Sequence, residues 1–430
     1  MSKTRKKTQP FYTILLLILA GEAVFILPFV LARVFRPTVL DVFDVTNLEL
    51  GTCFSVYGIV AFISYLLGGS LADKFQPKIL IATALFLTAA GGLFYATFPS
   101  FKMLLVLYGY WGFTTIFLFW AAMIKATRMW GGAAKQGLAF GLLDGGRGLV
   151  AASFGTLGVV IFSMFITTQI SEASLTDRKE AFKYVILVSS GIITFIGLLI
   201  LAFLKADTSR ENTILRKTWK ETFANYKIVI KIPAVWLLMI IILCAYVGYK
   251  ITDVFSLYAR EVMLYDEIDS AKVGTYLLYI RPIVGVGIGL LADRSKASLM
   301  MIIGFVVMLV GSTIFASGVI TPNMSMLFLI SLLITATGVY AFRTLYFAAM
   351  EEGKIPLVVT GTAVGLISLI GYTPDIFAGP AMGYLLDASP GETGHQHVFL
   401  MLGIFALIGL LAAIRFYGLS KKKTISERSF

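Results

Sequence analysis

A short segment occurs twice in the sequence, once in each half of the chain. The two copies are Gly69-Ser70-Leu71-Ala72-Asp73-Lys74 and Gly289-Leu290-Leu291-Ala292-Asp293-Arg294. Each copy ends a long apolar stretch and begins a short basic loop. Because the same turn lies at matching depth in two hydrophobic halves, the sequence indicates a duplicated helical bundle in a membrane.

The composition agrees with a membrane protein. Hydrophobic residues make up 58% of the chain and charged residues 14%, far from the balance of soluble domains. A spanning helix needs ~20 apolar residues, and the chain offers about twelve such runs. We therefore expect an all-α membrane protein with twelve transmembrane helices. The predicted spans are residues 11–34, 51–72, 79–98, 101–124, 137–166, 183–204, 234–258, 271–292, 297–320, 324–349, 357–387 and 396–418.

The positive charge follows the predicted topology. The formal net charge is +12, and most Lys and Arg outside the spans lie in alternate connections, above all in 1–10, 125–136, 205–231 and the C-terminal tail. This pattern follows the positive-inside rule, so we expect both termini in the cytoplasm. The chain would then be a multi-pass protein of the plasma membrane, which is the inner membrane in a bacterium. The charge needs no nucleic-acid partner to explain it.

The repeated turn resembles the loop signature of the major facilitator superfamily of secondary transporters. In that family the signature lies between the second and third helices and again between the eighth and ninth. The first copy departs from the family pattern after Lys74, where Phe75-Gln76-Pro77-Lys78 replaces the more usual Gly and Arg. The connection around Lys125 and Arg128 is similar to that of the organic-anion and organophosphate branch. The resemblance implies two six-helix bundles that work by alternating access.

One polar stretch divides the chain near its middle. Residues 205–231 mix basic and acidic side chains and read as a cytoplasmic linker. We therefore expect an N-terminal bundle in 1–204 and a pseudo-symmetric C-terminal bundle with a basic tail in 232–430. In transporters built this way the halves rock around a site near the bilayer midplane.

Several kinds of chemistry find no support in the sequence. No Walker A lysine pattern, nucleophile–base set or metal-ligand cluster occurs, so we expect neither an enzyme nor a bound cofactor or metal. Cys53 and Cys244 are expected to be free thiols. His395 and His397 fall in the last predicted outside loop, where we expect them to be solvated.

An ionisable side chain at the centre of a span costs roughly 2.5–3.5 kcal/mol to insert, so such residues are candidates for function. Glu22 lies about halfway through the span 11–34, on one face with Phe29 and Arg33. In the major facilitator superfamily, which the sequence resembles, the first helix lines the central cavity. Two readings stay open for Glu22: a carboxylate that carries the coupling proton, or half of a structural ion pair with a neighbouring helix.

The span 234–258 carries Tyr246, Tyr249, Lys250 and Asp253 at i, i+3, i+4 and i+7. All four therefore project from one face of a helix. The pattern predicts a polar substrate-binding wall, with Asp253 also a candidate for proton coupling. A purely structural Lys250–Asp253 pair is an equal alternative.

Two arginines lie deep in later spans. Arg281 is in the middle of 271–292, and no acidic residue lies within one turn of it along the sequence. Its fork suits carboxylates and phosphates, so we expect a partner from another helix or a substrate anion. The span 324–349 adds Tyr340 and Arg343 on one face, and both are predicted to bind substrate.

The span 357–387 carries Tyr372 and Asp375 on one face. We predict that Tyr372 binds substrate and that Asp375 is a second candidate proton carrier. The alternative role of Asp375 is that of a partner for Lys250 or Arg281.

A third group of residues is predicted to control the cytoplasmic gate. The family resemblance implies that the signature aspartates engage neighbouring helix ends when the inside is closed. The predicted gating residues are Gly69, Asp73, Lys74, Asp144, Arg147, Gly289, Asp293 and Arg294.

These observations predict a secondary active transporter that moves a small organic anion by alternating access, with proton symport. The sequence leaves open a proton-coupled exporter of amphipathic compounds, an anion exchanger, or a transport-inactive sensor on the same fold. The expected partners are the anionic substrate, protons and the lipid bilayer, and the expected state is a monomer.

Overall fold

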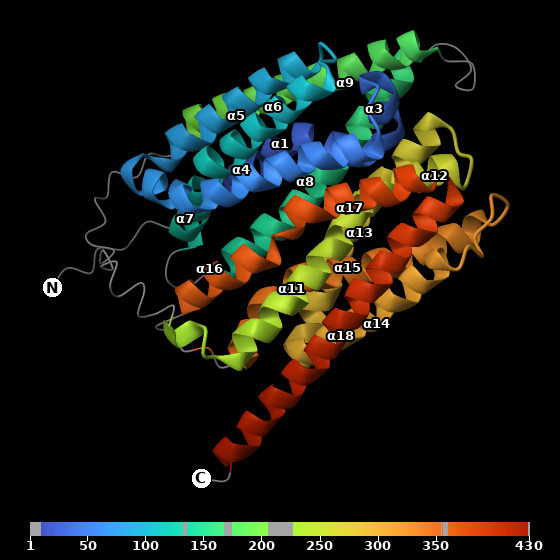
Figure 1. The fold of residues 1–430 in the computed structure, drawn as a ribbon. Coiled ribbons are helices and arrows are strands. Elements are labelled where there is room, and N and C mark those ends of the chain that lie inside the picture. Colours follow the sequence, from blue (N-terminus) through green and yellow to red (C-terminus); the bar gives the residue numbers. More distant parts are fainter. Residues whose placement is uncertain are drawn as a thin grey trace. The chain divides into compact units, whose positions relative to one another are not determined.

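The computed structural model describes residues 10–131, 136–166, 174–204, 227–353, 355 and 360–428. In these residues the regular structure is helical, without a strand (Figure 1), which confirms the all-α prediction. The first half contains α1 (Phe11–Phe25), η1 (Ile26–Val30), α2 (Leu31–Val34), α3 (Arg36–Phe43), α4 (Asn47–Lys74), α5 (Pro77–Tyr95), α6 (Phe101–Gly112), η2 (Phe113–Trp120), α7 (Ala121–Gly131), α8 (Gln136–Phe165) and α9 (Leu175–Phe203). The second half contains α11 (Pro233–Ile251), η4 (Thr252–Val254), α12 (Phe255–Glu261), α13 (Glu267–Arg294), α14 (Ala297–Ala316), α15 (Ser325–Glu352), α16 (Thr360–Gly371), α17 (Pro374–Ala388) and α18 (Glu392–Arg428).

Ten helices or runs of helices are long and apolar enough to cross a membrane, counted over the described residues. Two predicted spans are not among the ten: α13, and the pair α16 and α17. Helix α13 carries acidic residues in its first turn and Arg281 in its interior. The break after Gly371 leaves α16 and α17 with 12 and 15 residues, fewer than the ~20 of a single span. The number of twelve spans stays a prediction.

The exposed surface of both halves is rich in large apolar side chains. Val106 on α6, Met164 on α8 and Ile283 on α13 are 67%, 70% and 71% exposed. Apolar surface of this kind on long helices is favourable against hydrocarbon and unfavourable against water. The helices are therefore suited to a lipid environment.

The chain forms two compact units. Unit 1 comprises residues 1–44 and 56–209, and unit 2 comprises residues 45–55 and 210–430. The first turns of α4 thus group with unit 2 and the rest of α4 with unit 1. The predicted domain boundaries stay predictions, because residues 205–226 of the predicted linker 205–231 lie outside the described residues.

Within each unit the same helix pairs are in contact. In unit 1, α5 packs on α9 and α1 packs on α8. In unit 2, α14 packs on α18 and α11 packs on α16. In both cases the third predicted span of the half contacts the sixth, and the first contacts the fifth. The repeated pairing supports a pseudo-symmetric origin of the two units.

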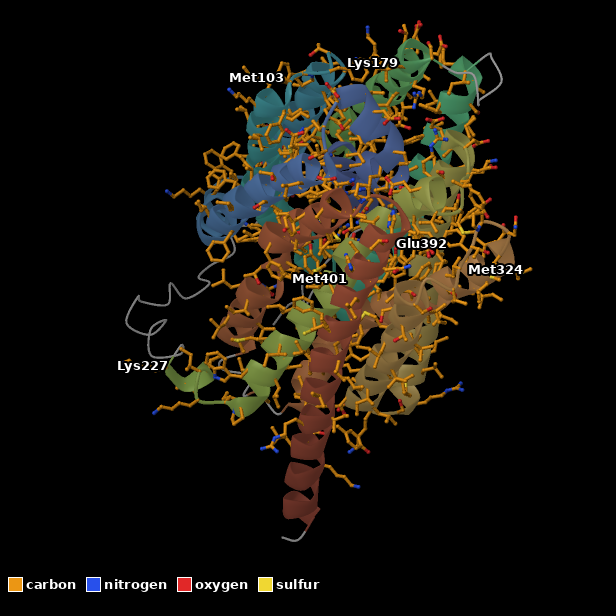
Figure 2. The ribbon with its side chains drawn as sticks, turned by 45° about the vertical axis from the view of Figure 1, so that its right-hand side comes forward. Met103, Lys179, Lys227, Met324, Glu392 and Met401 are labelled. Atoms are coloured by element: carbon orange, nitrogen blue, oxygen red, sulfur yellow. The ribbon has the colours of Figure 1, made fainter. Side chains whose placement is uncertain are left out.

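Helices of unit 2 begin at opposite ends of the bundle, as expected for antiparallel spans. Met324, directly before α15, and Glu392, the first residue of α18, lie toward one end of the unit, and Lys227, before α11, lies toward the other (Figure 2). The two ends of each long helix therefore fall on opposite sides of the bundle.

A glycine seam, formed by Gly51, Gly379 and Gly383, joins the start of α4 to α17 inside unit 2. A Cβ added to Gly51 would lie 2.3 Å from the Gly379 carbonyl oxygen, and one added to Gly383 would lie 2.4 Å from the Asn47 carbonyl oxygen. The backbones approach so closely that only glycine fits. Asp387 completes the contact, since its carboxylate accepts hydrogen bonds from the first amides of α4, at Asn47 (3.1 Å) and Leu48 (2.7 Å).

Three helices are interrupted close to buried charged residues. The π-helical segment η1 begins at Ile26, one turn after Glu22. The 3-10 segment η4 begins at Thr252, directly after α11 and Lys250. The break between α16 and α17 directly precedes Asp375. Irregular backbone in a membrane helix is tolerated where it is buried in protein or lines a cavity, and Glu22 and Lys250 beside these interruptions are buried.

Candidate functional site

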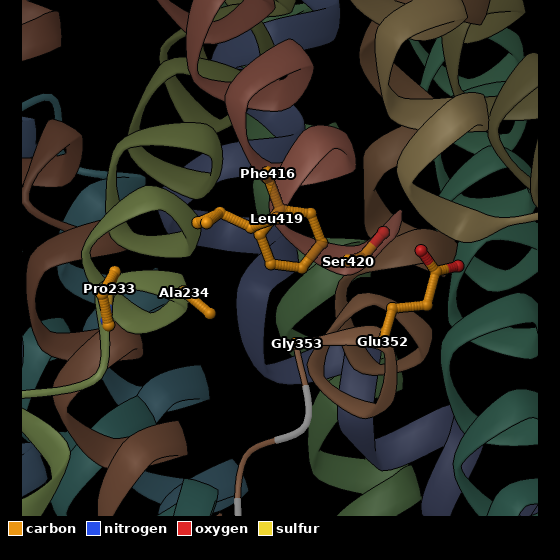
Figure 3. A pocket seen from close by; sticks show the side chains of 7 residues that line it. All are labelled: Pro233, Ala234, Glu352, Gly353, Phe416, Leu419 and Ser420. Carbon is orange, nitrogen blue, oxygen red and sulfur yellow. The ribbon is translucent and has the colours of Figure 1, made fainter. Parts of the chain in front are cut away.

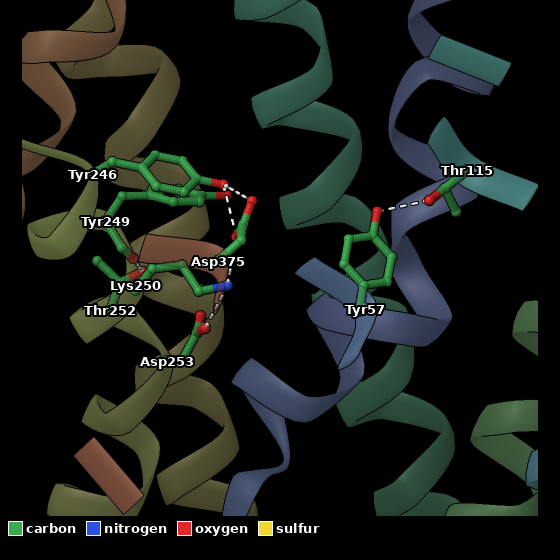
Figure 4. A network of polar contacts seen from close by, with 8 residues as sticks. All are labelled: Tyr57, Thr115, Tyr246, Tyr249, Lys250, Thr252, Asp253 and Asp375. Carbon is green, nitrogen blue, oxygen red and sulfur yellow. Dashed lines mark hydrogen bonds and ion pairs between the residues drawn. The ribbon is translucent and has the colours of Figure 1, made fainter. Parts of the chain in front are cut away.

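A polar cluster in unit 2 connects α11 to α17 (Figure 4). Lys250 Nζ lies 3.3 Å from Asp375 Oδ1 and 3.8 Å from Asp253 Oδ2. The hydroxyl of Tyr246 donates to the Asp375 carboxylate, at 3.1 Å from each oxygen. Tyr246, Lys250 and Asp253 therefore belong to one polar cluster, as the sequence predicts. Asp375 joins this cluster from α17, more than a hundred positions later in the chain.

Among the described side chains, the cluster contains one cation, Lys250, between two carboxylates. The side chains of Lys250 and Asp253 are 2% and 3% exposed, whereas that of Asp375 is 18% exposed. The Lys250 ammonium also lies 5.3 Å from the ring centroid of Phe54, at the start of α4. Burying a charge is tolerable when it is paired, and here two acids compete for one lysine. Asp375 is the more accessible of the two.

Four tyrosines predicted to bind substrate form a wall beside this cluster. The rings of Tyr246 and Tyr249 are stacked with centroids 5.5 Å apart, and Tyr372 meets Tyr246 edge-on at 4.8 Å. Tyr340 on α15 meets Tyr249 edge-on at 6.5 Å. The structure thus brings these residues together with Lys250. Their role in binding stays a prediction.

Two arginines of unit 2, Arg281 and Arg343, are predicted to bind substrate, and the structure describes the side chain of Arg281. Arg281 is buried in α13, with 4% of its surface exposed, and it interacts with neighbouring residues. The side chain of Arg343 lies outside the described residues, although its backbone belongs to α15. Substrate binding by either residue stays a prediction.

Unit 1 contains a buried ion pair between α1 and α8. Arg147 Nε donates to Glu22 Oε2 at 3.0 Å, and the two side chains are 10% and 5% exposed. The guanidinium carbon lies 5.3 Å from the Phe25 ring centroid and 5.6 Å from that of Trp120. Glu22 therefore has a partner from a neighbouring helix, and that partner is a residue predicted to act in gating.

The repeated turns end α4 and α13, where the side chains of Asp73 and Asp293 and the glycines Gly69 and Gly289 lie outside the described residues. Lys74 and Arg294 are exposed. The first turn is held by Lys125 on α7, whose Nζ donates to the Ala72 carbonyl at 2.7 Å. A lysine at a helix C-terminus is favourable because the last carbonyls carry partial negative charge.

The gating prediction for Asp144 also stays untested. Its side chain on α8 is half-buried and interacts with a neighbour, one turn before Arg147.

Two buried polar contacts, one in each unit, could not be predicted from the sequence. Tyr57 and Thr115 share a hydrogen bond of 2.6 Å, and Thr115 lies in the π-helical segment η2 (Figure 4).

His395 Nε2 lies 2.9 Å from Glu261 Oε2, and the histidine is fully buried. The expectation of a solvated His395 is wrong, because α18 already begins at Glu392 and its first turn packs against Tyr258.

A small cavity of about 50 Å³ lies in unit 2 where the start of α11 and the ends of α15 and α18 meet (Figure 3). Its lining includes Glu352, whose carboxylate accepts from the backbone amide (3.2 Å) and hydroxyl (2.5 Å) of Ser298 at the start of α14. The carboxylate is thus engaged in capping a helix N-terminus. Among the described residues, no group of three or more His, Cys, Asp or Glu could hold a metal ion.

The sequence comparison decides the family. Residues 13–374 match the sequence profile of the Major Facilitator Superfamily. The chain belongs to this superfamily. Its members are secondary transporters, so the protein is a multi-pass membrane protein of the transporter class.

Curated relatives come from bacteria. The chain is 26% identical over 384 residues to inner membrane protein YqcE of Escherichia coli (strain K12), covering 88% of both chains. It is 25% identical over 436 residues to inner membrane protein YihN of the same organism, covering 99% of this chain and 97% of the relative. Both superfamily relatives are thus similar over most of their length.

Solved structures agree on the fold. A bacterial homolog of the human lysosomal transporter Spinster, inward-facing and unoccupied, has a TM-score of 0.70 at 15% identity, with 95% of this chain and 97% of that chain covered. The nucleoside transporter NupG has a TM-score of 0.68 at 15% identity, with 94% and 99% covered. At such identities the likeness concerns the superfamily fold.

Proposed function

We propose that this protein is a proton-coupled symporter of a small organic anion. The observation that carries the proposal is the position of Lys250 against both Asp253 and Asp375. A substrate anion that reaches this lysine must share it with two carboxylates.

The charge count links the anion to a proton. Two unit charges 4 Å apart interact by about 4 kcal/mol at the effective dielectric constant near a protein surface. A third negative charge beside Lys250 is therefore strongly disfavoured unless one carboxylate becomes neutral. Asp375 is the carboxylate that takes the proton, because its side chain is the more exposed of the two. Binding of anion and proton together then leaves the charge of the cluster unchanged.

The surrounding residues fit an organic anion. A neutral carboxyl group is a weaker acceptor than a carboxylate, so protonation of Asp375 weakens its hydrogen bond from Tyr246, whose hydroxyl can then donate to the substrate. The stacked rings of Tyr246 and Tyr249 offer an apolar face to the carbon skeleton. The similarity of the loop around Lys125 to the organic-anion branch supports the same substrate class. The remaining parts of the proposal are a monomer in the plasma membrane, both termini in the cytoplasm, and Arg281 and Arg343 as further anion-binding residues.

The same cluster also suits a second function. Because two carboxylates face one lysine, an amphipathic cation can replace the proton on Asp375 and pack on the tyrosine wall. This would make the protein a proton-coupled exporter of amphipathic compounds. An anion exchanger differs from both, since it exchanges substrates without moving protons.

Proteoliposomes that contain a trapped pH indicator test the proposal. Inward gradients of carboxylate, phosphate-ester and sulfonate probes are applied at equal pH on both sides. We expect at least one probe to acidify the lumen, and we expect Lys250→Met to abolish that signal. Lys272→Met is the matched control, because Lys272 forms an exposed pair with Asp269 at 2.7 Å. Acidification that survives in Lys250→Met contradicts the proposal. Proton release driven by cationic dyes supports the exporter, and labelled exchange without acidification supports the exchanger.

A further inference from the structure

Among the described residues, no hydrogen-bond acceptor is bound at the terminal edge of the Arg147 guanidinium group. In the part of the chain that the structure describes, its side chain donates one hydrogen bond, through Nε to Glu22. The Nη1 and Nη2 groups form the fork that binds planar or tetrahedral oxyanions with two parallel hydrogen bonds. An arginine that is about nine-tenths buried thus presents its binding edge while its other donor is occupied.

The surroundings hold this fork in one orientation. Phe25 at the end of α1 and Trp120 at the end of η2 both lie within cation–π distance of the guanidinium. The stem of Arg147 crosses α1 at Gly21, where an added Cβ would lie 3.2 Å from Arg147 Cδ and 2.9 Å from Met123 Sδ. Side chains from three elements therefore fix the arginine before any ligand arrives.

The pair in unit 1 corresponds to the pair in unit 2 with the charges exchanged. Glu22 lies on the first predicted span of its half and Arg147 on the fifth. Lys250 lies on the first predicted span of the second half and Asp375 on the fifth. In both units a buried ion pair joins the same two helices next to an interruption of the first span. The two pairs therefore occupy corresponding positions in the two units.

We propose that Arg147 is an oxyanion-binding residue of unit 1, with Glu22 as its exchangeable counter-ion. The ligand class is a solute with a carboxylate, phosphate or sulfonate group. The oxyanion binds at Nη1 and Nη2, and Glu22 takes a proton when the anion neutralises the guanidinium. This assignment rests on the proposed function, which it deepens: the substrate carries an oxyanion group, and unit 1 has an oxyanion site of its own, with Glu22 as the proton-accepting counter-ion.

Trp120 provides a direct readout, because its ring contacts the guanidinium. The purified protein in a neutral detergent is titrated with acetate, methyl phosphate and methanesulfonate, with acetamide as the neutral probe, while tryptophan emission is followed. The Trp120→Phe protein supplies the background from the other tryptophans. We expect a saturable change in the wild type with at least one oxyanion and none with acetamide.

Variants of the arginine decide the assignment. Arg147→Met should remove the Trp120 signal, and Arg147→Lys, which keeps the charge and loses the fork, should weaken apparent affinity by ~10-fold or more. Arg178→Lys, an arginine paired with Asp41 in unit 1, should leave the titration unchanged. If Arg147→Met fails to fold, Arg147→Lys alone decides. An unchanged titration in Arg147→Lys, or no saturable change in the wild type, overturns the inference.

A failure of this inference is distinguishable from a failure of the proposed function. Lys250→Met should keep the Trp120 signal while it loses anion-driven acidification. Loss of the Trp120 signal in Lys250→Met contradicts an independent site in unit 1. Anionic lipid is also added to the lipid-free protein in detergent. A change in Trp120 emission with this lipid, but with none of the soluble probes, contradicts a solute as the ligand.

Discussion

Lys250 and Asp375 join α11 to α17 through an ion pair with 3.3 Å between Nζ and Oδ1. The lysine is almost fully buried, while the aspartate retains some exposure beside a break in its helix. Opening this pair requires that either a proton or another ion replaces the lost partner, because a buried charge left alone is costly. The pair is therefore suited to exchange partners during a transport cycle.

The glycine seam should control how tightly the start of α4 packs on α17. Gly51→Ala places a Cβ 2.3 Å from the Gly379 carbonyl oxygen, and overpacking of this kind costs about 1–3 kcal/mol. Cys53, two residues on, is fully buried, so its labelling by a maleimide reports opening of the seam. In a Cys244→Ser background we expect labelling to rise roughly tenfold, equivalent to ~1.4 kcal/mol.

The matched control for that experiment is Gly365→Ala in α16. A Cβ at Gly365 meets nothing within 4 Å, so the labelling rate of Cys53 should not change. Equal rates in Gly51→Ala and the unsubstituted background would show that the seam does not restrict Cys53.

His395 should contribute to the stability of unit 2. His395→Ala removes the hydrogen bond to Glu261 and leaves a void beside Tyr258. We expect a loss of about 2 kcal/mol or more in the free energy of unfolding, measured as a lower melting temperature in detergent. His397→Ala is the control, because His397 is exposed. Equal melting temperatures for the two variants would rule out the stabilising contact.

Lys125 should stabilise the first repeated turn. Lys125→Met removes the charged donor to the Ala72 carbonyl, and a hydrogen bond to a charged group contributes about 1.5–3 kcal/mol. Because Lys125 is half-buried, we expect a loss near the lower end, ~1.5 kcal/mol, again measured by thermal unfolding. Lys102→Met, at an exposed lysine of α6, should have no comparable effect. Equal melting temperatures for Lys125→Met and Lys102→Met would show that Lys125 does not stabilise the end of α4.

Much of the fold could be predicted from the sequence because membrane spans have a strong local signal. Helical periodicity alone places Tyr246, Tyr249, Lys250 and Asp253 on one face, and the structure has them there. The repeated turns predict the duplication, which the family match and the fold confirm.

Contacts between distant helices could not be predicted in the same way. The sequence places Glu22 halfway through its span, but its partner Arg147 depends on how α1 packs against α8. Asp375 had two candidate partners, and tertiary packing selects Lys250. The π-helical segments and the burial of His395 likewise depend on neighbours far away in the sequence.

Uptake into proteoliposomes by the Asp375→Asn protein measures whether Asp375 exchanges a proton during transport. The variant is compared with the wild type and with Asp269→Asn, an exposed aspartate, using an anion that acidifies wild-type vesicles. Asparagine fixes the neutral form, so uptake driven by an imposed pH gradient should fall by ~10-fold or more, because a carboxylate that titrates is required for coupling. Exchange of labelled anion at equal pH should survive. If uptake by Asp375→Asn still follows the pH gradient, Asp375 does not carry the coupling proton.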